Sequence, residues 1–190
     1  IAARVMAGAS LADLDVHERI PEQVSVKEVV LPFDRLPESD PTLGPEMKST
    51  GEVMATAGST GKAYQKAQMA IGKPIPTDGT AYLDLGHEEF PAADSPEGRA
   101  LREGFARHFT IADFSDEAAL EAAIEAGEVD LVVARERPPL RVAVDHEVTY
   151  FSTYPSAKAA LDALEAQDEP LDVGPVSARP TREAQWGAPD

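Results

Sequence analysis

Between residues 80 and 166, short apolar runs alternate with amphipathic stretches of helical period, and this alternation constrains the fold more than any other feature. Strands are expected at residues 80–85, 109–114, 129–134, 141–144 and 148–151, and helices begin at Ser95, Ser115 and Pro155. Pro96 stands in the first helical turn after Ser95, and Gly127 follows a helix as a C-terminal glycine does. Strands separated by such helices form βαβ units, so we predict an α/β fold with a mainly parallel, Rossmann-like sheet.

The first 70 residues have a different pattern, with a strand expected at residues 26–32, a proline-punctuated loop, and a helix at residues 61–70 capped by Thr60. Residues 1–11 look like the middle of a helix, so we expect the fold to continue upstream. We therefore divide the chain into an α+β segment at 1–71, a linker at 72–79, an α/β domain at 80–168 and a disordered tail at 169–190 that holds Trp186.

The charge balance is strongly acidic, with 34 Asp and Glu against 17 Lys and Arg and a net charge of −17. This excludes nucleic acid as a partner, because such a binder needs a basic face. No apolar run is long enough to span a membrane, and the absence of cysteine excludes disulfides and thiolate metal sites. The carboxylates are scattered along the chain, which favours a cytoplasmic protein of a high-salt host over an acidic interaction surface.

No motif for a self-sufficient active site is present. The segment at residues 58–63 is superficially like a phosphate-binding loop, but Thr56 and Ala63 depart from that motif and a helix N-terminus is the favoured interpretation. The triplet at 87–89 does not have the spacing of a metal-ligating helical pair. We therefore predict neither a catalytic residue nor a metal site in this chain, and interpret His17, His108 and His146 as surface or structural residues.

One candidate site follows from topology. Ser152 and Thr153 lie between an expected strand end and an expected helix start, where open α/β sheets bind ligands and free N–H groups attract anions. Small-molecule binding and simple capping of the helix by one hydroxyl both explain these two residues.

Four stretches resemble the large subunit of carbamoyl phosphate synthases. They are Ala-Ala-Arg-Val-Met-Ala-Gly at residues 2–8, Ser-Leu at 10–11, the segment around Ser-Val-Lys-Glu at 25–33, and residues 40–54 from Asp-Pro-Thr-Leu-Gly to Gly-Glu-Val-Met. The resemblance implies the end of the second ATP-grasp half, followed by a methylglyoxal-synthase-like regulatory domain of the fold class predicted above. It implies an ATP-dependent ligase that makes carbamoyl phosphate from bicarbonate and glutamine-derived ammonia for arginine and pyrimidine synthesis, with this segment supplying scaffold and allosteric regulation.

The resemblance also implies ligands and partners. The complete enzyme uses ATP, Mg²⁺ or Mn²⁺ and K⁺, none of which is expected in this segment, and pairs with a glutaminase small subunit. Glu28 matches the family glutamate that helps bind ornithine, and the regulatory-domain hydroxyl of that site falls at Ser152 or Thr153. The alternative hypothesis is a free-standing α/β effector-binding or interaction module without catalysis.

The regulatory half departs from the family pattern. Residues 111–114 run directly into a helix, where the family has a phosphate-binding turn, and residues 135–139 replace a second such turn. The domain is expected to be shorter by about one strand and one helix. Arg135, Arg137 and Arg141 remain candidates for an anionic nucleotide effector, although a solubilising role at the sheet edge is favoured.

Overall fold

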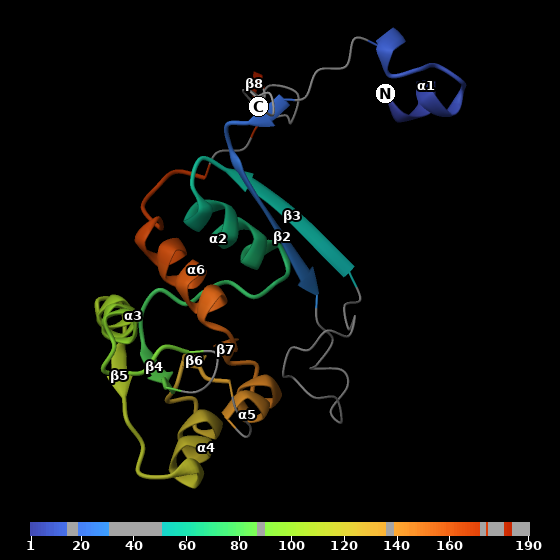
Figure 1. Ribbon diagram of the computed structural model, residues 1–190. Helices are drawn as coiled ribbons and strands as arrows, with labels where there is room; N and C mark the ends of the chain where they lie inside the picture. Colours follow the sequence, from blue (N-terminus) through green and yellow to red (C-terminus); the bar gives the residue numbers. More distant parts are fainter. Residues whose placement is uncertain are drawn as a thin grey trace.

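The structure is a computed structural model that describes residues 1–14, 19–30, 51–86, 90–135, 139–171, 174 and 181–183. Its centre is a parallel sheet of four strands in the order β5-β4-β6-β7 (Figure 1). These strands are β4 (Thr80–Leu83), β5 (Thr110–Ala112), β6 (Leu131–Val133) and β7 (Thr149–Phe151). All three neighbouring pairs are parallel, which confirms the α/β prediction and agrees with a Rossmann-like fold.

Helices cover both faces of this sheet. They are α3 (Pro96–Ala106) and α6 (Tyr154–Glu165) on one face, and α4 (Glu117–Glu125) and α5 (Pro139–Asp145) on the other. Successive residues of a strand point to opposite faces. Leu131 and Val133 therefore join the core beneath α3 and α6, whereas Val132 packs with α4 and α5. A strand that is apolar on both sides needs this double cover.

Side-chain caps start the helices where the sequence predicts. Ser95 accepts the backbone N–H of Gly98 at 3.0 Å, and Asp116 accepts that of Ala119 at 2.9 Å. Each cap pairs one of the free N–H groups of a first helical turn. Gly127, with φ of 71°, follows α4 in the left-handed conformation expected after a helix.

The strand predicted at residues 141–144 is wrong, because these residues belong to helix α5. Leu140, Ala143 and Val144 are buried, a spacing of three and four that forms one helical face. Arg141 pairs with Asp145 one turn later on the more exposed side. A run of so few apolar residues has the same appearance in a strand and in a buried helix, so periodicity alone misassigned it.

Before the α/β unit, β2 (Val24–Val30) and β3 (Gly51–Ala57) form an antiparallel pair, and α2 (Thr60–Ala70) packs against both strands. The start of the chain forms helix α1 (Ala2–Met6) and the 3₁₀ turn η1 (Ala12–Leu14), with α1 lying away from the parallel sheet (Figure 1). Strands β1 (Arg19–Pro21) and β8 (Thr181–Glu183) pair antiparallel, so part of the expected disordered tail is a strand. The expected loop at 32–45 and Trp186 lie outside the described residues.

Helices α2 and α6 touch backbone to backbone and join the two parts of the molecule (Figure 1). A Cβ on Gly61 would stand 2.1 Å from the backbone oxygen of Asp162, so only glycine allows this approach. The Nζ of Lys62 is buried and donates to the backbone oxygens of Ala166 and Gln167, both at 3.3 Å. The predicted helix N-terminus at residues 58–63 is confirmed, although the cap is Ser59, one residue before Thr60.

Candidate functional site

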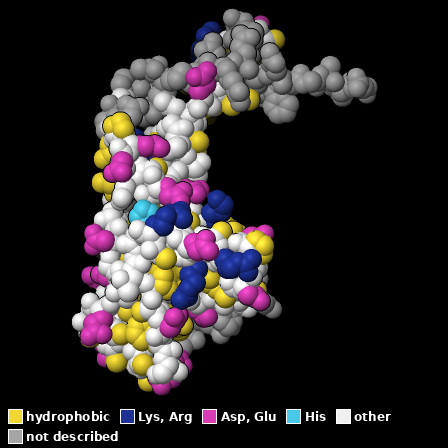
Figure 2. Space-filling view, turned by 90° about the vertical axis from the view of Figure 1, so that its left-hand side faces the viewer, with side chains coloured by type: hydrophobic (Ala, Val, Ile, Leu, Met, Phe, Trp, Pro, Cys, Tyr) yellow, Lys and Arg dark blue, Asp and Glu magenta, His cyan; other side chains and the backbone are white. Residues whose placement is uncertain are grey.

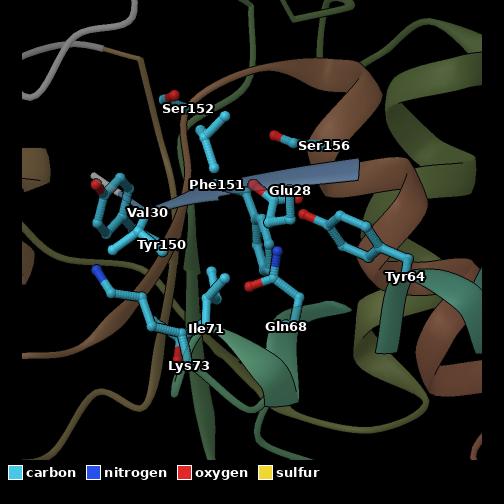
Figure 3. A pocket seen from close by; sticks show the side chains of 12 residues that line it. Glu28, Val30, Tyr64, Gln68, Ile71, Lys73, Tyr150, Phe151, Ser152 and Ser156 are labelled. Carbon is cyan, nitrogen blue, oxygen red and sulfur yellow. The ribbon is translucent and has the colours of Figure 1, made fainter. Parts of the chain in front are cut away.

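A pocket lies where β2 and α2 meet β7 and the start of α6 (Figure 3). Its free volume is about 120 Å³, which is below the roughly 300–1,000 Å³ of pockets for drug-sized ligands and suits a smaller molecule. Glu28 and Ser152, two of the three predicted effector residues, line this pocket from opposite parts of the chain. The remaining lining residues are Val29, Val30, Tyr64, Gln68, Ile71, Lys73, Thr149, Tyr150, Phe151 and Ser156.

Glu28 reaches the pocket because strand β2 turns alternate side chains toward α2. Val26 and Val30 lie on the same side of the strand, and Val26 packs against the core. Partial burial raises the pKa of Glu28 above its ordinary value, while hydrogen bonds from the Val29 backbone and the Gln68 side chain act in the opposite direction. A half-buried carboxylate that forms no ion pair with a described side chain is a favourable receptor for a ligand cation.

Tyr64 and Gln68 form the wall of the pocket that comes from α2. They are four residues apart on one helical face and are 8% and 6% exposed. Burial first, and then the negative charge of Glu28, raise the pKa of Tyr64, so its phenol stays neutral at physiological pH. The sequence analysis gave neither residue a role. The available signal was that each follows a small residue of the buried helix face, Ala63 or Ala67.

Ser152 and Thr153 have different environments, although they are adjacent. Ser152 is 5% exposed and lines the pocket directly after β7. Thr153 caps α6: its hydroxyl accepts the N–H of Ser156 at 3.3 Å, and Ser156 caps it in return. The structure therefore places Glu28 and Ser152 at the same pocket and gives Thr153 the capping role. Ser156, which Thr153 caps, is a second serine that lines the pocket.

Lys73 stands on another side of the pocket, beside Tyr150. Its Nζ lies 5.5 Å from the centre of the Tyr150 ring, within the range of a cation–π contact. The backbone N–H of Lys73 donates to the backbone oxygen of Gln68 at 3.0 Å, so the backbone of Lys73 is held in place by the end of α2. Sequence reasoning assigned Lys73 to a linker and gave it no role.

The arginines proposed for an anion lie elsewhere. Arg141 pairs with Asp145 on α5. Arg135 lies shortly after β6 and interacts with other groups of the protein, whereas Arg137 lies outside the described residues. Beyond β5, at the other end of the strand order, Arg102 is paired with Asp113 at 3.1 Å. Arg102 and Arg141 are therefore both engaged by carboxylates.

Metal and membrane features can be judged for the described residues. His108 and His146 are described there, whereas His17 and the triplet at 87–89 lie outside. No group of three His, Asp or Glu in the described ranges is arranged to hold a metal ion. None of the helices described is long and apolar enough to cross a membrane. On the face shown in Figure 2, carboxylates are scattered over the coloured surface, whereas most of the visible Lys and Arg side chains lie near its middle.

Several known proteins similar to this chain are large chains of carbamoyl phosphate synthase. The carbamoyl phosphate synthase large chain of Halobacterium salinarum is 47% identical over 188 residues, covering 98% of this chain and 16% of that protein. The large chain of Methanoculleus marisnigri is 35% identical over 204 residues, which cover 93% of this chain and 19% of that protein. The large chain of Pseudomonas syringae pv. tomato is 46% identical over 106 residues, which cover 55% of this chain and 10% of that protein. The chain is homologous to part of the carbamoyl phosphate synthase large chain. No protein-family model matches it.

The carbamoyl phosphate synthase homology covers a C-terminal portion of a longer protein, and the chain spans less than a fifth of the relatives it matches. Those relatives are ligases, of which this chain matches a small part. The match to the archaeal synthase includes both Glu28 and Ser152, because it extends over nearly the whole chain. Both walls of the pocket therefore lie inside the homologous region.

Proposed function

We propose that this chain is the C-terminal segment of a carbamoyl phosphate synthase large subunit, where it supplies scaffold and allosteric regulation. The complete enzyme would make carbamoyl phosphate from bicarbonate and glutamine-derived ammonia for arginine and pyrimidine biosynthesis. Residues 1–71 would end the ATP-grasp half, residues 72–79 would be the linker, and residues 80–168 would form the regulatory domain. The homology to named large chains supports this assignment.

One observation carries the regulatory part of the proposal: Glu28 and Ser152 line the same pocket from two different units. A ligand that contacts Glu28 on β2 and Ser152 after β7 would bind best at one relative position of the antiparallel pair and the parallel sheet. Binding would then favour that position, and coupling of this kind typically amounts to about 1–3 kcal/mol.

The pocket favours an amino-acid effector such as ornithine over a nucleotide. Its free volume is about 120 Å³, and the residues described around it provide one carboxylate, one lysine and several hydroxyls. A phosphate would instead need several N–H groups or basic side chains directed at one point. Glu28 is proposed to bind the ligand's ammonium group, and Ser152 to hydrogen-bond its polar end.

The remaining parts of the proposal concern the complete enzyme. ATP with Mg²⁺ or Mn²⁺ and K⁺ would act at sites of the longer subunit, and a glutaminase small subunit would be the partner. We propose a cytoplasmic location in a high-salt host, which the net charge of −17 and the similarity to a Halobacterium protein support.

Calorimetric titration of the intact synthase with L-ornithine tests the site. The wild type is expected to bind, and Glu28→Gln is expected to weaken binding at least tenfold, the effect of losing one charge-assisted contact. Glu52→Gln is the matched control, because Glu52 lies on the neighbouring strand and does not line the pocket. Its carboxylate pairs with the Nζ of Lys27 at a distance of 2.7 Å. Absence of binding by the wild type, or equal losses in both variants, would refute the site.

Co-purification from the source cell tests the assignment itself. A glutaminase subunit that purifies with this chain is the expected result. Purification of the chain without one, as a short independent protein, would favour the alternative of a free-standing effector-binding or interaction module.

A further inference from the structure

The pocket contains two opposite charges that do not neutralise each other. Of the residues described around it, Glu28 and Lys73 are the charged ones, and the structure shows no ion pair between these two. Lys73 instead extends along Tyr150, with its Nζ 5.5 Å from the ring centre. In Figure 3 the two side chains enter the pocket from different sides. Opposite charges held apart across a cavity match a ligand that has both charges itself.

The surface between the two charges is apolar. Ile71 lies between Lys73 and Gln68 in the view of Figure 3, and the pocket is also lined by Val30 and by Phe151, which is 4% exposed. Buried apolar walls between charged ends suit the methylene chain of a small ligand, because they remove it from water without any need for hydrogen bonds. The pocket therefore presents a negative end, an apolar middle and a positive rim.

We propose that Lys73 is a specificity-determining residue of the effector site, which selects zwitterionic ligands by binding their carboxylate while Glu28 holds their ammonium group. This inference rests on the proposed function, since it assigns the second end of the same ligand. An ammonium donates readily to a carboxylate, and the flat face of Tyr150 keeps the flexible lysine chain near the rim. A diamine of the same length would satisfy Glu28 and meet repulsion from Lys73.

The test compares two ligands that differ by one carboxylate, L-ornithine and 1,4-diaminobutane, titrated calorimetrically into the intact synthase. The wild type is expected to bind L-ornithine at least about tenfold more tightly, the effect of one charge-assisted hydrogen bond. Lys73→Met keeps the length and apolar packing of the side chain and is expected to abolish this preference. Lys73→Arg, which restores a donor and a charge, is expected to recover most of it.

Lys158→Met is the matched control, because Lys158 is 58% exposed on α6 and does not line the pocket. It is expected to leave both affinities unchanged. If L-ornithine binds but Lys73→Met leaves the ratio of the two affinities unchanged, the role of Lys73 is refuted and the site itself stands. If Lys73→Met weakens both ligands equally, its role is structural. If the wild type binds neither ligand, the proposed site fails together with this inference.

Discussion

Replacing Gly61 by alanine tests the contact that holds α2 against α6. In a helix this change usually stabilises a protein by up to about 1 kcal/mol, because alanine has the higher helix propensity, and Gly61 stands in the first turn of α2. Here the new Cβ would lie 2.1 Å from the backbone oxygen of Asp162, whereas ordinary contact begins at 3.4 Å. The two helices would have to separate by about 1.3 Å, the difference between these distances. Neither partner is a side chain that can rotate away.

Overpacking of this kind costs about 1–3 kcal/mol, and contact with rigid backbone places Gly61→Ala at the upper end. Subtracting the gain in helix propensity leaves an expected loss of about 2 kcal/mol in the free energy of unfolding. Urea unfolding followed by far-ultraviolet circular dichroism measures it. Because Tyr64 and Gln68 follow Gly61 on the same helix, the separation is also expected to weaken ligand binding in the pocket.

Gly104→Ala is the matched control, since Gly104 faces α6 from α3. Its new Cβ would meet the Cδ2 of Leu161 at 2.3 Å, but this atom is the end of a side chain that can change rotamer. Such an adjustment costs about 0.5–1.5 kcal/mol, so the gain in helix propensity nearly cancels it. A Gly61→Ala variant as stable as the wild type, or no less stable than Gly104→Ala, would refute the close packing of α2 on α6.

Three other predictions concern charge. Lys62→Met is expected to lower the free energy of unfolding by about 2 kcal/mol, because it removes the buried donor that the oxygens of Ala166 and Gln167 share, whereas the exposed Lys158→Met should change it little. Glu28 has a pKa above its ordinary 4.5, so its ionisation destabilises the native state as pH rises through that range. Glu28→Gln should therefore unfold at higher urea than the wild type at about pH 7, and the gain should vanish at about pH 4. Raising KCl from about 0.1 M to about 1 M shortens the Debye length from about 10 Å to about 3 Å, and should raise the thermal midpoint of a chain with a charge of −17. An unchanged midpoint would contradict the high-salt interpretation.

The elements that the sequence predicts correctly are those with local causes. Ser95 and Asp116 accept the N–H groups of residues three positions ahead, so their role depends on a single turn. The parallel sheet follows from the alternation of strands and helices, which also depends on neighbouring residues. Helix α5 was mistaken for a strand because a run of so few apolar residues fits both a strand and a buried helix, and packing against α4 decides between them.

The pocket could be predicted less completely, because it exists only when distant elements meet. Glu28 was selected through a family resemblance, and Ser152 through its place after a strand. Tyr64, Gln68 and Lys73 became pocket residues because α2 packs on α6, which sequence periodicity does not encode. The glycine that permits this packing, Gly61, had been interpreted as part of a helix start, since nothing local shows that another backbone approaches it.

Helix α2 is the element through which a filled pocket would act on the rest of the proposed enzyme. One side of it contributes Tyr64 and Gln68 to the pocket, and the same helix packs on β2 and β3. Its first turn is held to α6 by the backbone contact at Gly61 and by the two hydrogen bonds from Lys62. Close-packed backbone leaves little room for independent sliding, so α2 and α6 would shift as one body. A ligand between β2 and β7 would then move the antiparallel pair relative to the parallel sheet, whereas α2 would keep its position on α6.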